Sequence, residues 1–78
     1  MMGLMEYALI IERDPETRAV TATSPDIEGL YLVGDPSESD DMIIERFRES
    51  IAFRFGYLRE RGIPIPLPRH RVAMVGAA

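Results

Sequence analysis

The chain has 78 residues, of which 46% are hydrophobic and 28% charged, and it carries a net charge of −4 and no Cys. This length allows one small domain and excludes two, while the composition is that of a globular protein and excludes a disordered tail. Disulfides and thiolate metal sites are excluded by the lack of Cys, and no apolar run approaches the roughly 18 residues needed to cross a bilayer.

Three short strands are predicted in the first half of the chain. Residues 5–12 alternate, with Tyr7, Leu9 and Ile11 on one face and Ala8 and Ile10 on the other. An Asp-Pro turn separates them from residues 19–23, which are rich in β-branched side chains and should pair antiparallel with the first strand. Residues 30–33 form the third predicted strand, which ends at a Gly-Asp-Pro sequence.

A helix of about five turns is predicted next. Either Ser37 or Ser39 can cap its start, and the acidic residues that follow suit the positive end of the helix dipole. Gly62 is suited to end it. One apolar stripe should pack on the sheet, formed by Ile44, Phe47, Ile51, Phe55 and Leu58. Three apolar residues fall beside that stripe and should be partly exposed: Ile43, Phe53 and Tyr57.

The C-terminal part is predicted to be extended. Residues 63–68 alternate with Pro, which favours a stiff polyproline II strap. Residues 70–75 can form a fourth strand, and residues 76–78 should fray. The predicted fold is therefore a single α+β domain, residues 1–78, with the order β-β-β-α-β and one helix packed on one face of a small, mostly antiparallel sheet.

The charges are divided unevenly along the chain. Residues 1–44 carry ten acidic and two basic side chains, a net charge of −8, whereas residues 45–78 carry three acidic and seven basic ones, a net charge of +4. The acidic half can attract a basic partner, although charge alone favours the simpler explanation, ordinary solubility. Arginines on the helix can follow a phosphate backbone or can pair locally, as Glu45 with Arg48 and Arg46 with Glu49.

Few residues point to catalysis or metal binding. His70 is the single His, and the densest group of carboxylates, Glu38, Asp40 and Asp41, is explained by the helix dipole. The glycines form neither a dinucleotide-binding fingerprint nor a phosphate-binding loop. We therefore expect no enzyme activity, catalytic residue, cofactor or metal, and no membrane contact. The expected location is the cytoplasm, and the small core favours a homo-oligomer, dimeric or tetrameric.

The order of several short motifs resembles that of the HicB-like antitoxin family. The motifs are Tyr7-Ala8-Leu9-Ile10-Ile11-Glu12, Ser24-Pro25-Asp26-Ile27-Glu28-Gly29, Gly34-Asp35, Glu49-Ser50-Ile51 and Gly62-Ile63-Pro64-Ile65-Pro66. The resemblance covers residues 5–68 and implies a partial ribonuclease-H-like fold without nuclease activity. It also implies a function: binding and neutralising a small basic toxin of the HicA type, which cleaves mRNA.

Five positions match the family pattern, and we expect them to set turns and chain exits: Pro25, Asp26, Gly29, Gly34 and Pro66. Two features depart from it. Leu30 stands where family members often have Cys, and only ten residues follow residue 68, where many members carry a DNA-binding domain. We therefore expect no direct binding to nucleic acid. The alternative is an orphan HicB-like domain that acts as a nucleic-acid-binding or regulatory adaptor.

Overall fold

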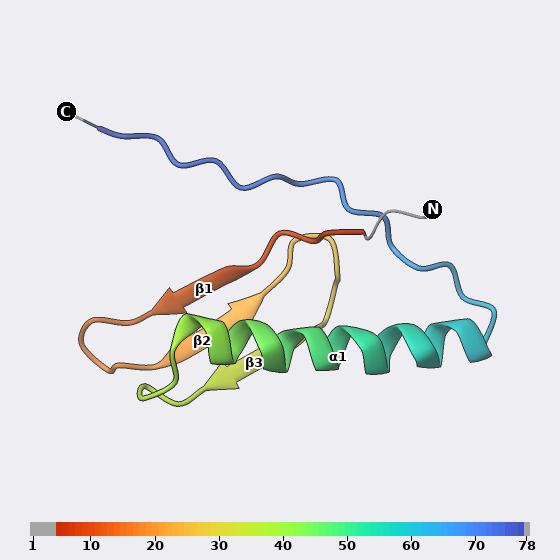
Figure 1. Ribbon diagram of the computed structural model, residues 1–78, viewed down its shortest axis with the longest axis horizontal. Helices are drawn as coiled ribbons and strands as arrows, with labels where there is room; N and C mark the ends of the chain where they lie inside the picture. The colour runs from red at the N-terminus through yellow and green to blue at the C-terminus, as the bar shows by residue number, and fades with distance from the viewer. Residues whose placement is uncertain (1–4, 78) are drawn as a thin grey trace.

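The computed structural model describes residues 5–77 and shows a three-stranded sheet followed by one long helix (Figure 1). The strands are β1 (Ile10–Arg13), β2 (Val20–Thr23) and β3 (Tyr31–Gly34), and the helix is α1 (Asp40–Glu60). The sheet is antiparallel with the order β1-β2-β3. The predicted α+β class and the β-β-β-α order are confirmed.

The central strand β2 contributes two buried side chains to the side of the sheet that faces α1. Its residues alternate between buried and half-buried, with Val20 and Ala22 on the covered side. Ala22 lies opposite Ile11 of β1 and Leu32 of β3, so the three residues form one apolar row across the sheet. β1 is paired only from Ile10 onward, which is shorter than the predicted strand over residues 5–12.

Both ends of α1 have recognisable caps. Of the two candidates, Ser39 is the N-cap, and its side chain accepts a hydrogen bond from the Met42 N–H at 3.2 Å. At the other end Gly62 adopts a positive φ of 66°, which a residue with a Cβ rarely adopts. The Ile63 N–H then donates to the Leu58 carbonyl at 2.9 Å and closes the last turn.

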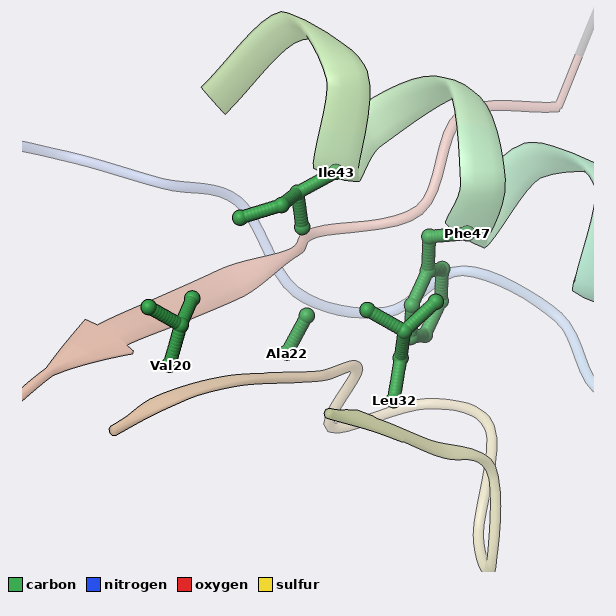
Figure 2. Close-up of a cluster of buried hydrophobic side chains, with 5 residues drawn as sticks. All are labelled: Val20, Ala22, Leu32, Ile43 and Phe47. Carbon is green, nitrogen blue, oxygen red and sulfur yellow. The ribbon is translucent and has the colours of Figure 1, made fainter. Parts of the chain in front are cut away.

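The core is small and lies between α1 and the sheet (Figure 2). Five buried side chains form it: Val20, Ala22, Leu32, Ile43 and Phe47. The prediction for the first turn of the helix was wrong, because Ile43 is fully buried whereas Ile44 is 38% exposed. Both residues precede Phe47 by about one turn, so spacing alone does not separate them. Phe53 and Tyr57 are exposed as predicted.

Gly34 explains why Ile43 is buried and Ile44 is not. A Cβ at Gly34 would lie 3.3 Å from Ile43 Cδ1 and 3.2 Å from Val20 Cγ1. Because Gly34 has no side chain, Ile43 enters this space and packs directly against the end of β3. Periodicity in the helix sequence carries no information about that opening in the sheet.

The predicted fourth strand is wrong. Residues 70–75 have no regular secondary structure, and they leave the body of the molecule as an exposed segment (Figure 1). The strap at residues 63–68 also has no helix or strand. The alternating pattern of residues 70–75 favours an extended backbone, but a strand also needs a neighbouring strand edge, and this segment reaches none in its own chain. Residue 78 of the predicted frayed end lies outside the described residues.

Among residues 5–77 no helix combines the length and the apolar character needed to cross a membrane.

Candidate functional site

Two of the family-motif residues, Asp26 and Pro66, take part in the contacts that fix the C-terminal strap. The Asp26 carboxylate accepts hydrogen bonds from the Arg69 N–H at 2.8 Å and the His70 N–H at 3.0 Å, and it contacts His70 Nδ1 at 2.7 Å. The Tyr7 hydroxyl donates to the Pro66 carbonyl at 2.6 Å, and the Tyr7 ring packs edge-on against Phe55. Asp26 and Pro66 therefore serve the same purpose, which is to fix the direction in which the chain leaves the domain.

We call the contacts of Tyr7 and Asp26 with residues 66–70 the strap tie. Its electrostatics keep Asp26 ionised and Tyr7 protonated. The Asp26 side chain is only 4% exposed, and this burial raises its pKa. The hydrogen bonds from the Arg69 N–H, the His70 imidazole and the His70 N–H outweigh that effect, so the net pKa of Asp26 is lowered. Burial, and then the nearby Asp26 charge, raise the pKa of Tyr7. Asp26 thus remains an acceptor and Tyr7 a donor at neutral pH.

The loop between β2 and β3 contains the other motif residues of that region. Pro25 lies exposed in a turn that is closed by a hydrogen bond from the Ile27 N–H to the Ser24 carbonyl. Gly29 adopts a positive φ of 78°, which explains a glycine there. Arg54 of α1 donates to the carbonyls of Glu28 and Gly29 and holds the loop against the helix. These contacts give Pro25 and Gly29 a place in shaping the loop.

Acidic residues near the start of α1 are engaged within the chain. Glu38 Oε1 accepts the Asp35 N–H at 2.7 Å and pairs with Arg46 at 2.5 Å, and these two contacts lower the pKa of Glu38. Asp40 pairs with Arg13 at 2.8 Å. Within residues 5–77, no group of three His, Cys, Asp or Glu side chains is placed to hold a metal ion.

Pairing of the helix arginines differs in part from the prediction. The pair between Glu45 and Arg48 is confirmed, with a separation of 2.5 Å. The predicted pair between Arg46 and Glu49 is wrong, because Arg46 reaches back to Glu38. Glu38 lies before the helix and has only 12% of its side chain exposed, so it offers a better-shielded partner than Glu49 does.

The face of the sheet opposite α1 carries mostly exposed side chains. Strand register arranges its side chains in two rows, Ile10 with Thr23 and Tyr31, and Glu12 with Thr21 and Val33. Ile10, Tyr31 and Val33 are all exposed, and Tyr31 has 61% of its surface accessible. We call these six side chains the open sheet face. Its composition, three apolar side chains among hydroxyls and one carboxylate, suits contact with another macromolecule.

A second exposed feature is a shallow groove between β3 and α1. The groove has a volume of about 500 Å³ and is lined by apolar and charged side chains, among them Leu30, Leu32, Phe53, Glu49 and Arg54. Phe53 projects from the rim and is 83% exposed. The groove is open to solvent along its length and adjoins the edge of the sheet.

Sequence reasoning grouped Tyr7 with Leu9 and Ile11 on one face of the first strand but did not identify its hydrogen bond to the strap. It also treated His70 as a residue of the fourth strand, whereas His70 belongs to the strap tie. No family model, curated protein or solved structure matches the chain. The HicB-like resemblance therefore depends on the order of the motifs, and it stays a prediction.

Proposed function

We propose that this chain is a non-enzymatic, HicB-like antitoxin-type protein that binds a small basic, mRNA-cleaving toxin of the HicA type and covers the toxin's active site. The observation that carries the proposal is the open sheet face, on which Ile10, Tyr31 and Val33 are exposed beside Glu12. The motif order and the β-β-β-α order support it. Binding alone neutralises the toxin, so no covalent step is needed.

The size of the open sheet face shows how far the contact must extend. Three strands of four residues, at about 3.3 Å per residue and about 4.8 Å between strands, give a face of roughly 200 Å². A stable protein interface buries about 800 Å² on each partner. The toxin must therefore also contact the segments around the sheet.

Those surrounding segments carry the charge that a basic toxin requires. Glu6 precedes β1, Glu16 lies between β1 and β2, and Glu28 lies between β2 and β3. These three residues and Glu12 of the open sheet face are exposed. The carboxylates of all four make no ion pair with another described residue. Exposed carboxylates on the segments that flank the strands favour rapid association with a cationic partner.

Three of the arginines of α1 have contacts within the chain that do not favour binding of nucleic acid. Arg46 and Arg48 pair with glutamates, and Arg54 donates to two backbone carbonyls. A phosphate backbone would have to compete with each of these contacts, which reduces the favourable term from counterion release.

The proposal requires a small basic protein encoded in a reading frame next to that of this chain, and coexpression with that protein tests it. Wild type should restore growth to cells that produce this toxin, and the double variant Y31D/V33D should not, because two charges would be buried in the contact. The matched control is F53S, which removes an exposed aromatic side chain of α1 outside the open sheet face and should still restore growth. Failure of wild type to rescue, or rescue by Y31D/V33D as efficient as that by wild type, contradicts the proposal.

A further inference from the structure

The C-terminal segment, residues 71–77, has the pattern of a strand without the pairing of one. It is exposed along its whole length, and Met74 has 91% of its surface accessible. In an extended backbone Val72 and Met74 project to one side, and Arg71, Ala73 and Val75 to the other. Three large apolar side chains of this segment are exposed to water in a single copy of the chain: Val72, Met74 and Val75. This exposure does not stabilise the single copy.

The outer edge of β1 has the complementary features. β1 pairs with β2 on one side only, so among the described residues its other edge has no ladder partner. On the side that faces the core, Leu9 and Ile11 are only partly buried. On the opposite side Ile10 and Glu12 are exposed. A strand added at this edge would therefore meet apolar side chains on both of its faces and one carboxylate.

Residues 71–77 match both sides of that edge. With Val72 and Met74 turned toward the core, they would complete the cover over Leu9 and Ile11. The other side would then place Val75 and Arg71 on the face that carries Ile10 and Glu12. The charges also agree, since residues 5–14 contain three acidic side chains and one basic, whereas residues 71–77 contain one Arg and no acid.

The strap tie directs residues 71–77 away from the sheet of their own chain. Asp26 fixes the backbone at Arg69 and His70, and Tyr7, just before β1, fixes it at Pro66. From there the segment runs in the same general direction as β1 in the view of Figure 1, without joining it, and continues beyond its end. The tie therefore aims the segment past its own sheet.

We infer that residues 71–77 form a strand that adds to the outer edge of β1 in a second copy of this chain, and that two copies exchange these segments about a two-fold axis. The strap and the accepting edge lie on the same side of the molecule, because Tyr7 contacts the strap directly before β1 begins. A two-fold axis on that side satisfies both segments and closes the assembly at a dimer. Addition to β3 instead would require the segment to reach the other edge of the sheet, two strands away from β1.

Crosslinking in the full-length chain tests this exchange, and the lack of natural Cys makes the experiment clean. A variant with E12C and R71C is treated with a short bismaleimide, which tolerates a small shift in register. Covalent dimers are expected, because each Cys in β1 would lie beside the Cys of the other copy's segment. The control variant combines V33C with R71C, which the exchanged dimer holds about 14 Å apart, or three strand spacings, and it should crosslink weakly.

Three results of the crosslinking experiment would overturn the inference. Crosslinking of E12C/R71C within one monomer would show that the segment pairs within its own chain. A ladder of higher oligomers, or efficient crosslinking of V33C/R71C, would also contradict the exchanged dimer. Sedimentation equilibrium gives an independent measurement. Wild type should be a dimer, and V72D/M74D should raise the dissociation constant of that dimer at least about 100-fold, because it places charges in the new ladder. If V72D/M74D does not fold, the crosslinking experiment still decides. A monomeric wild type also overturns the inference.

Discussion

Neighbouring isoleucines at the start of α1 should differ sharply in their contribution to stability. Ile43 is fully buried among Val20, Ala22, Leu32 and Phe47, whereas Ile44 is 38% exposed. Truncating Ile43 to Ala removes about three carbon atoms, worth roughly 2.4 kcal/mol at about 0.8 kcal/mol each. The cavity left in this small core adds to that loss, so I43A should destabilise the protein by about 3–4 kcal/mol. I44A leaves no enclosed cavity and should cost about 1 kcal/mol.

Urea denaturation of wild type, I43A and I44A, followed by circular dichroism, measures these free energies of unfolding. The difference between the two variants, about 2–3 kcal/mol, corresponds to roughly 10 °C or more in Tm for a domain of this size. The loss in I43A is also a large part of the total, since a chain of 78 residues has roughly 4–12 kcal/mol of stability. Equal destabilisation by the two variants, or a larger effect of I44A, would refute the packing of α1 described above.

Other consequences of the structure can be checked in the same way. G34A should destabilise the protein by about 1–2 kcal/mol, because the new Cβ would lie 3.2 Å from Val20 Cγ1, whereas G56A, in an open part of α1, should stabilise it by about 0.5–1 kcal/mol; denaturation curves that rank them in the opposite order would contradict this. D26A should release the strap and speed tryptic cleavage after Arg69 and Arg71, with D26N intermediate, since Asn keeps one oxygen acceptor; unchanged cleavage would show that the tie does not hold the strap. Stability should fall in acid, because four carboxyl groups have a pKa lower in the folded state than their ordinary values of 3.8 for Asp and 4.5 for Glu. The four groups are Asp14, Asp26, Asp35 and Glu38. Their contribution to stability is complete above the ordinary pKa values and is lost as the pH falls through the folded-state pKa values. Urea midpoints that stay constant from pH 7 to pH 3 would contradict these lowered pKa values.

Local sequence patterns predicted the elements whose causes are themselves local. Alternation placed Tyr7, Leu9 and Ile11 together on one face of the first strand, and all three contact the core or Phe55. Ser39 was one of two candidate caps, and the choice of Ser39 over Ser37 depends on Asp35, which accepts hydrogen bonds from the Ser37 hydroxyl and N–H. These features are decided within a few residues along the chain.

The features that sequence reasoning missed depend on residues far apart in the chain. Ile43 is buried because Gly34 leaves room for it, and Arg46 pairs with Glu38 across the start of the helix. The role of Asp26 depends on a strap more than 40 residues later. The fourth strand was the largest error, since a period of two indicates an extended backbone and does not identify the edge with which it pairs.

The most direct test of the proposed binding function is an NMR titration of the labelled chain with a small basic protein from a neighbouring reading frame, which the proposal requires. We predict that the largest amide shifts fall on β1, β2 and β3 around Ile10, Tyr31 and Val33, while the amides of α1 around Phe53 are unchanged. Shifts centred on α1, the absence of any shift at protein concentrations of tens of micromolar, or a genome without such a neighbouring gene would contradict the antitoxin role.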